Sequence, residues 1–341
     1  MKPNIKQIAF LLAIALRLSA WQGASLTFAE SPNAFAGNWA MTMPNGSSGW
    51  LTIVENAGQF EGELWTVGSP KKLSDVALTG KELRFNRKCK VGEPEFEGGP
   101  PTGDSLDCRH IATLQNDVIR IAMTTTKEDG STLSESMSGK RMPPLPAPPN
   151  LKSIRFGDPI ELFNGRDLSG WKLSNPKQIN GWKVVDGALV NDTPKLDFQP
   201  WSRYGNLRSD REFMDFKLSI DFKVPAGGNS GIYLRGVYEA QVVDRDSRMQ
   251  GLQGVGAIFS RIAPSEQAGK AGDEWQHYDI ILVDRHVTVV LNGVEVIDNQ
   301  PLLGCTNGAF QADETIPGPI YLQGDHTAVS YRNIMLFPRM N

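Results

Sequence analysis

Alternation of apolar and polar residues with a period of two recurs along this chain and constrains its fold more than any other feature. Clear examples are DFKLSIDFKV, residues 215–224, and QNDVIRIAM, residues 115–123. Successive side chains of a strand point to opposite faces, so this period is typical of strands with one buried face. Long helical periodicity is absent, and Gly, Asn and Asp separate the short runs. The sequence therefore predicts an all-β protein.

A proline-rich stretch divides the chain into two parts. In MPPLPAPPN, residues 142–150, five of nine residues are Pro, a composition that favours an extended, semi-rigid spacer. We predict a small all-β domain at residues 30–141, a linker at 142–153 and a second domain at 154–341. The first domain is expected to be a small barrel or sandwich of about five to seven strands. The second fits an antiparallel sandwich with jelly-roll topology.

The first residues are typical of an exported protein. Lys2 and Lys6 precede the apolar run IAFLLAIAL, residues 8–16, and small residues follow up to Ala29. This order predicts a secretory signal peptide at residues 1–29 and a periplasmic or secreted mature protein. The apolar run is shorter than the roughly 20 residues that a membrane helix needs. We therefore expect no integral membrane span after cleavage, with an uncleaved anchor as the alternative.

Charge and cysteine usage restrict the partners and cofactors. The net charge is −3 with no run of Lys or Arg, so nucleic acid is not an expected partner. No P-loop or βαβ pattern predicts a nucleotide cofactor, and no CxxC or HxxxH spacing predicts zinc. Cys89 and Cys108 could form a disulfide or remain two buried thiols, whereas Cys305 has no evident mate. The segment DRDS, residues 244–247, fits either a loop Ca²⁺ site or a solvated turn.

The segment GGNSGIYLRGVYEAQVVD, residues 227–244, reads as a hairpin with an unusually polar face. With a turn near residues 236–237, alternation would place Arg235 and Glu239 close together on one face. One interpretation is a plain cross-strand ion pair on a solvated surface. The other is the polar floor of a binding site. The residues on this predicted face are Asn229, Tyr233, Arg235, Glu239 and Gln241.

Residues 154–339 resemble the 3-keto-disaccharide hydrolase domain family. The resemblance rests chiefly on ELFNGRDLSGW at 161–171, GGNSGIYLR at 227–235 and LQGDHTAVSYRNI at 322–334, which occur in the family's order. It implies a concanavalin A-like β-sandwich that acts on an oxidised oligosaccharide or glycoside carrying a ketone at C3. Family members are similar in cleaving such glycosides by elimination and hydration.

The chemistry implied by this resemblance assigns roles to several residues. A C3 ketone acidifies the hydrogen on C2, so the enzyme needs a positioned base and a donor, cation or metal for the enolate charge. Glu239 is the first candidate for the base or for a ligand of a divalent metal such as Ca²⁺, and His326 is the second titratable candidate. Candidate substrate-binding residues are Asn229, Tyr233, Arg235, Gln241 and Gln323, with Lys270 and Trp275 closing one side.

Three interpretations of the second domain remain open. The first is the 3-keto-glycoside enzyme, and the second is a non-catalytic carbohydrate-binding module of the same fold. A two-carboxylate glycosidase ranks lower, because only Glu239 is well placed on the predicted face. Thr327 stands where family members often have Gly, so the loop at His326 is expected to bend differently. His277 is expected to pack or face water, and Glu314 to lie in a solvated turn.

Overall fold

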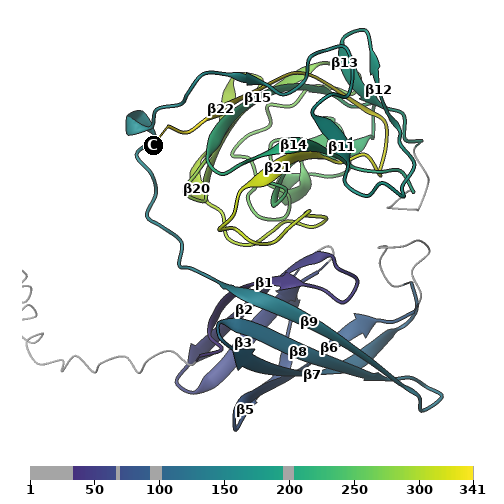
Figure 1. The fold of residues 1–341 in the computed structure, drawn as a ribbon, viewed down its shortest axis with the longest axis vertical. Helices are drawn as coiled ribbons and strands as arrows, with labels where there is room; N and C mark the ends of the chain where they lie inside the picture. The colour runs from purple at the N-terminus through teal and green to yellow at the C-terminus, as the bar shows by residue number, and fades with distance from the viewer. Residues whose placement is uncertain (1–33, 67–69, 93–101, 195–202, 341) are drawn as a thin grey trace, which may run out of the picture. The chain divides into compact units, whose positions relative to one another are not determined.

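The computed structural model describes residues 34–66, 70–92, 102–194 and 203–340. These residues form strands, turns and two short 3₁₀ segments (Figure 1), which confirms the all-β prediction. The predicted signal peptide lies outside the described residues, so export stays a prediction. Phe35–Asn341 forms one compact unit, and the predicted domain boundaries also stay a prediction. No helix within the described ranges is long and apolar enough to span a bilayer.

An antiparallel sheet of nine strands precedes the proline-rich stretch. The prediction was about five to seven strands. Its order is β4-β3-β2-β1-β9-β8-β7-β6-β5, and β3 contacts β5 near the opposite end of that order. The sheet therefore curls on itself, as long twisted sheets do. Its strands are β1 (Gly37–Thr42), β2 (Ser48–Asn56), β3 (Gln59–Trp65), β4 (Lys71–Lys72), β5 (Ser74–Thr79), β6 (Glu82–Lys90), β7 (Ser105–Gln115), β8 (Val118–Thr126) and β9 (Thr132–Met142).

Alternation explains the interior of this nine-stranded sheet. In β8, Ile119, Ile121 and Met123 are buried, whereas Arg120 and Ala122 between them are exposed. The same period in the neighbouring strands gathers an apolar core that includes Trp39 and Phe85. After Met142, residues 143–150 form neither strand nor helix, and a single 3₁₀ turn, η1 (Leu151–Ser153), follows.

The remaining strands form two antiparallel sheets. The eight-stranded sheet has the order β12-β13-β22-β15-β18-β19-β20, with β10 paired to β22. Its strands are β10 (Ile160–Glu161), β12 (Trp182–Val185), β13 (Ala188–Asn191), β15 (Phe216–Lys223), β18 (Gln276–Val283), β19 (His286–Leu291), β20 (Val294–Pro301) and β22 (Val329–Pro338). The five-stranded sheet has the order β11-β14-β21-β16-β17. Its strands are β11 (Trp171–Leu173), β14 (Leu207–Phe213), β16 (Asn229–Leu234), β17 (Tyr238–Val243) and β21 (Gly318–Leu322).

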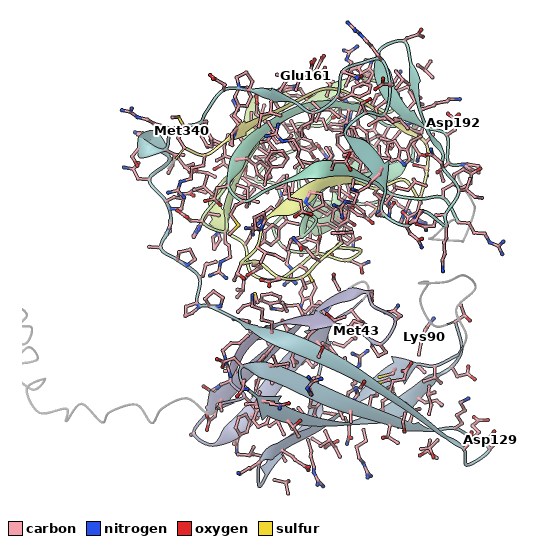
Figure 2. All side chains as sticks on the ribbon, viewed as in Figure 1. Met43, Lys90, Asp129, Glu161, Asp192 and Met340 are labelled. Atoms are coloured by element: carbon pink, nitrogen blue, oxygen red, sulfur yellow. The ribbon has the colours of Figure 1, made fainter. Side chains whose placement is uncertain are left out.

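Apolar side chains from both sheets share one core, and they fill the interior of the sandwich (Figure 2). Phe216, Leu218 and Ile220 of β15 belong to it together with Ile232 and Leu234 of β16. This arrangement is the predicted antiparallel jelly-roll sandwich of concanavalin A-like type. Each sheet therefore has an inner face in the core and an outer face directed away from it.

Local turn chemistry fixes two hairpins. Asn292 and Gly293 both have positive φ, 51° and 85°, between the paired residues Leu291 and Val294, as the Asn-Gly signal predicts. The hairpin of β16 and β17 also turns through left-handed residues, Arg235 at φ 56° and Gly236 at φ 65°. The pairing of β16 with β17 determines which side chains of the candidate site lie next to each other.

Candidate active site

A row of three polar side chains crosses the outer face of the five-stranded sheet. Tyr233 of β16 pairs with Glu239 of β17 on one side and with Tyr321 of β21 on the other. Directly paired residues of a sheet project to the same face. Ile232 and Leu234, which flank Tyr233, lie in the core, so the row lies on the face opposite the core. The predicted placement of Tyr233 and Glu239 on one face is confirmed.

A second row lies beside the first and leaves a notch at its centre. Gly231 of β16 pairs with Gln241 of β17, and the Gln323 backbone N–H donates to the Gly231 carbonyl at 3.0 Å. A Cβ atom on Gly231 would overlap the carboxyl group of Glu239. The Glu239 carboxyl group therefore lies over the backbone of Gly231, the residue that is flanked in the sheet by Gln241 and Gln323.

Burial makes Glu239 an unusual carboxyl group. Its relative exposure is 4%, and burial is the main cause that raises its pKa well above the usual value. A hydrogen bond with Tyr233 lowers this pKa, and the negative charge of Asp325 raises it further. The folded protein thus holds a proton on Glu239 more tightly than an exposed glutamate would be held.

Two amide oxygens beside Glu239 are left without protein donors. Gln241 Oε1 and Gln323 Oε1 are buried and have no hydrogen-bond partner among the described residues. Their amide nitrogens are engaged, because Gln241 Nε2 donates to the Gln253 carbonyl at 3.1 Å and Gln323 Nε2 to the Tyr233 hydroxyl at 3.5 Å. A buried acceptor without a partner is costly. These two oxygens are therefore suited to accept hydrogen bonds from a ligand's hydroxyl groups.

Asp325, which the sequence interpretation did not single out, connects His326 with the charges of the site. His326 Nδ1 lies 2.6 Å from Asp325 Oδ1, and both side chains are mostly buried. The Asp325 carboxylate also raises the pKa values of Glu239 and Tyr233, so its charge acts on the same site. In the sequence, only the position of Asp325 two residues after Gln323 could have indicated that it belongs near the site.

Thr327 fixes the loop that carries His326. Its hydroxyl accepts from the Asn229 backbone N–H at 2.8 Å and lies 3.0 Å from the Asn229 carbonyl, to which it donates. The hydroxyl therefore joins the segment after β21 to the first residue of β16. Asn229 lies beside Gln241, whose Nε2 is 3.4 Å from Asn229 Oδ1, and its role in substrate binding stays a prediction.

The predicted placement of Arg235 beside Glu239 is wrong. Arg235 occupies the turn with a positive φ, so it leaves the strand alternation on which the prediction rested. Its buried guanidinium group approaches the Tyr238 hydroxyl, with Nη2 at 3.4 Å, and Met214 Sδ. Tyr238 lies in the core cluster, so Arg235 points to the inner side of the sheet.

The predicted closing of one side of the site by Lys270 and Trp275 is also wrong. The Trp275 ring packs against Lys223 of β15 and Arg332 of β22, at 5.3 Å and 4.0 Å from its centroid. Both strands belong to the eight-stranded sheet. Lys270 is exposed, and its Nζ donates to the Trp275 carbonyl at 3.0 Å. The pair therefore covers part of the other sheet.

The loop of residues 302–317, between β20 and β21, covers the row of polar side chains. The Tyr233 hydroxyl donates to the Asn307 carbonyl at 2.8 Å, and the Glu239 backbone N–H donates to Thr306 Oγ1 at 2.9 Å. A Cβ atom on Gly308 would lie only 2.7 Å from the Tyr233 hydroxyl. The sequence did not predict these contacts, because no local sequence pattern shows which strands a long loop will contact.

Glu314 anchors that loop, contrary to the expected solvated turn. Its side chain is fully buried. Its Oε1 accepts from the Tyr238 hydroxyl at 2.8 Å and from the Gly304 N–H at 2.6 Å, and its Oε2 accepts from Arg285 Nη1 at 3.0 Å. A carboxylate with three donors is well compensated for its burial.

A cation does lie on the same face as Glu239, at the far end of its row. Arg208 of β14 pairs with Tyr321, and its guanidinium carbon lies 4.8 Å from the centroid of the Phe310 ring. Phe310 is 37% exposed and also packs against Tyr321. Arg208 and Phe310 therefore form a rim between the covered row and solvent.

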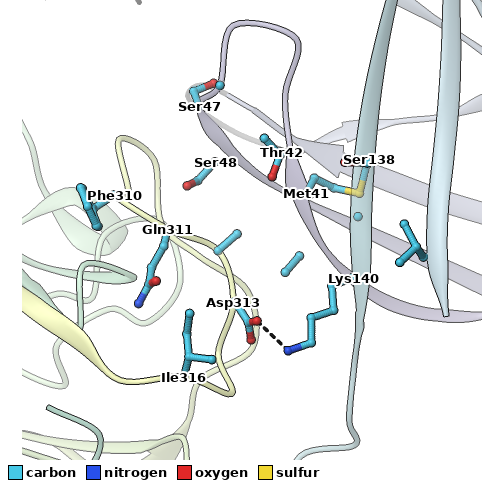
Figure 3. Close-up of a pocket in the computed structure, with 15 residues that line it drawn as sticks. Met41, Thr42, Ser47, Ser48, Ser138, Lys140, Phe310, Gln311, Asp313 and Ile316 are labelled. Carbon is cyan, nitrogen blue, oxygen red and sulfur yellow. Dashed lines mark hydrogen bonds and ion pairs between the residues drawn. The ribbon is translucent and has the colours of Figure 1, made fainter. Parts of the chain in front are cut away.

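A cavity of about 430 Å³ borders the Phe310 end of this face (Figure 3). Its lining includes Met41, Ser138, Gln311 and the ion pair of Lys140 with Asp313, whose charged atoms lie 2.8 Å apart. None of the predicted site residues lines it. The cavity is therefore not the candidate active site.

The outer face of the eight-stranded sheet carries a second polar group. His277 Nδ1 lies 2.7 Å from Asp221 Oδ1, and His277 Nε2 lies 3.3 Å from Ser219 Oγ. These distances resemble a nucleophilic triad. However, Asp221 and His277 are directly paired residues of the neighbouring strands β15 and β18. Strand β15 is hydrogen-bonded to a strand on each side, so its backbone N–H groups are not free to stabilise an oxyanion. Cross-strand stabilisation accounts for the arrangement.

The described residues contain no cluster of three or more His, Cys, Asp or Glu placed to hold a metal ion. In the turn at 244–247, Asp244 is buried and accepts from the backbone N–H groups of Gly227 and Asp246 at 2.7 and 2.9 Å. Asp246 pairs with Arg245. The turn is thus satisfied by the protein itself.

Known protein families and solved structures were similar to about half of the chain. A family model described as the 3-keto-alpha-glucoside-1,2-lyase-like domain matches residues 158–336, more than half of the 341 residues. A "putative glycosyl hydrolase" from Parabacteroides distasonis is 21% identical, with a TM-score of 0.42, over 53% of this chain and 93% of that one. The carbohydrate-binding module CBM66 from Bacillus subtilis is 12% identical, with a TM-score of 0.32, over 49% and 95%. A search of curated proteins found no match.

Proposed function

Because the chain belongs to the 3-keto-alpha-glucoside-1,2-lyase-like domain family, we propose that it cleaves glycosides whose C3 hydroxyl is oxidised to a ketone. The proton on C2 is removed, the substituent on C1 leaves, and water adds to the resulting double bond. One observation carries the proposal: a buried carboxyl group lies over Gly231, on a face whose neighbouring residues Gln241 and Gln323 have amide oxygens without protein donors.

Glu239 is the base in this proposal. A ketone at C3 acidifies the hydrogen on C2, but a carboxylate in water is too weak a base to remove it quickly. Burial raises the pKa of Glu239, so its deprotonated form binds a proton more strongly than an ordinary carboxylate. A base positioned in this way typically contributes about 10²–10⁴-fold to the rate.

Tyr233 and Gln323 are the donors for the enolate oxygen. Burial raises the pKa of Tyr233 well above its usual value, so the phenol keeps its proton. In this scheme the hydroxyl turns from the Asn307 carbonyl, to which it donates at 2.8 Å, to the enolate oxygen. Gln323 Nε2 lies 3.5 Å from the Tyr233 hydroxyl, so one substrate oxygen can be bound by both groups. Fixed donors at a developing negative charge are often the largest contribution to catalysis.

His326 transfers the proton of the leaving group in this scheme. Its Nδ1 is engaged with Asp325, which leaves Nε2 as the atom that exchanges a proton. Meanwhile Gln241 Oε1 and Gln323 Oε1 accept hydrogen bonds from sugar hydroxyls, which removes the cost of two unsatisfied buried acceptors. The roles of base, donor, proton carrier and hydroxyl acceptor are thus divided among separate side chains.

The central experiment compares a 3-keto-disaccharide with its unoxidised parent, with and without a chelator. We expect loss of the keto form only, and a rate reduced about 10²–10⁴-fold in Glu239→Gln. Glu295→Gln is the matched control, because Glu295 is exposed on β20 and should keep the wild-type rate. A Glu239→Gln variant with undiminished activity would remove Glu239 from the mechanism.

Proton exchange separates the enzyme from a binding module. A 1,5-anhydro-3-keto sugar has no leaving group on C1, so in D₂O it reports C2 proton removal alone. We expect exchange in the wild type and in His326→Gln, and none in Glu239→Gln, whereas His326→Gln should lose cleavage of the disaccharide. Calorimetric binding of the keto sugar without exchange or cleavage would instead support the carbohydrate-binding module.

A further inference from the structure

The nine-stranded sheet contains two cysteines that face the same interior. Cys89 on β6 and Cys108 on β7 are 5% and 1% exposed. The register pairs Cys89 with Leu106 and Arg87 with Cys108. The two cysteines are therefore diagonal neighbours on one face of an antiparallel pair. They lie far along the chain from the residues of the candidate active site, so the inference does not depend on the proposed function.

The surroundings of this pair stabilise negative charge on sulfur. Cys108 Sγ lies 2.8 Å from Thr125 Oγ1, and Cys89 Sγ lies 3.7 Å from Met123 Sδ. Arg87 is directly opposite Cys108, and its Nε and Nη1 are buried without a hydrogen-bond partner among the described residues. Arg87 as a whole is half-buried, and two buried N–H groups without partners are stabilised by a nearby anion. A thiolate on Cys108 supplies one.

The protonation of the two thiols differs accordingly. The hydrogen bond from Cys89 is the main cause that lowers the pKa of Cys108, with Thr125 and Arg87 contributing. The same shared hydrogen bond, together with burial, raises the pKa of Cys89, although the charge of Arg87 lowers it. One sulfur is thus prepared to act as a nucleophile, while its neighbour keeps a proton.

We propose that Cys89 and Cys108 are a redox-active thiol pair that reacts with low-molecular-weight disulfides, Cys108 as the attacking thiolate and Cys89 as the resolving thiol. The Cys108 thiolate attacks one sulfur of the small disulfide, whose S–S bond breaks and releases one thiolate. Cys89 then loses its proton and attacks the Cys108 sulfur, which releases the second small thiolate. Two protein thiols are oxidised to one disulfide, and the small disulfide is reduced to two thiols.

The test treats the folded full chain with oxidised glutathione at pH 7 and follows the intact mass. We expect the wild type to lose two hydrogens, and dithiothreitol to reverse the change. Cys89→Ser should stop at one glutathionyl group on Cys108. Cys108→Ser should react at least about tenfold more slowly, because a thiol without a lowered pKa has little thiolate at pH 7. Cys305→Ser is the control and should behave as the wild type.

Arg87 provides a second readout that a purely structural pair would not give. Arg87→Gln should slow the reaction of Cys108 and move its pH–rate profile to higher pH, with far-ultraviolet circular dichroism unchanged. The proposal is overturned if the folded wild type does not react although the urea-unfolded chain does. It is equally overturned if Cys89→Ser and Cys108→Ser react at the same rate.

Discussion

At the scale of single residues, the buried carboxyl group of Glu239 links function to stability. Its pKa is raised in the folded protein, whereas an unfolded chain leaves it near the ordinary value of about 4.5. Between these two pKa values the folded state binds more protons than the unfolded state. The free energy of unfolding contributed by this group therefore falls as pH rises above about 4.5.

The stability of Glu239→Gln should consequently increase relative to that of the wild type as pH rises. The amide cannot ionise, so the variant escapes the loss of stability that the wild type suffers above about pH 4.5. We expect the melting temperature of the variant to gain on that of the wild type from pH 5 to pH 8. Thermal melts of both proteins across this range provide the measurement. Parallel curves would show that Glu239 is not protonated differently in the folded and unfolded states.

Residues also show where sequence interpretation succeeds. Tyr233, Glu239 and Gln241 were placed correctly, because strand alternation is a local property. Arg235 was misplaced, because two left-handed residues in the turn end the alternation before it reaches this position. Asp325 was missed, because its influence on Glu239 depends on how the segment after β21 returns across the sheet.

At the scale of elements, the loop of residues 302–317 decides how the outer face of the five-stranded sheet is used. The strands supply the polar side chains, and this loop shields them through Asn307 and Thr306. Its own anchor, Glu314, binds three donors in the interior. Sequence patterns predicted the strands but not this cover, because a long loop has no period and its course depends on distant contacts.

Glu314→Gln should therefore impair both stability and activity. Removing one partner of a buried ion pair leaves Arg285 uncompensated, at a cost of about 3–5 kcal/mol, and it loosens the loop over Tyr233. Urea denaturation and turnover of the 3-keto substrate are the measurements. Asp313→Asn is the comparison variant in the same loop, because its partner Lys140 is 55% exposed while Asp313 is 20% exposed, and an ion pair in contact with solvent contributes about 0.2–1 kcal/mol. Equal effects of the two substitutions would contradict the anchoring role.

At the scale of the whole molecule, the sandwich presents two polar outer faces separated by one apolar core, and only one of them carries the proposed chemistry. His277→Ala and Ser219→Ala remove the triad-like group from the eight-stranded sheet. Because that group consists of cross-strand contacts, each substitution should lower the free energy of unfolding by about 0.2–1 kcal/mol and leave turnover of the 3-keto substrate unchanged. Combining either one with Glu239→Gln should give additive effects on stability, since the sites share no partner. A tenfold loss of turnover in Ser219→Ala would instead indicate that the chemistry takes place on the outer face of the eight-stranded sheet.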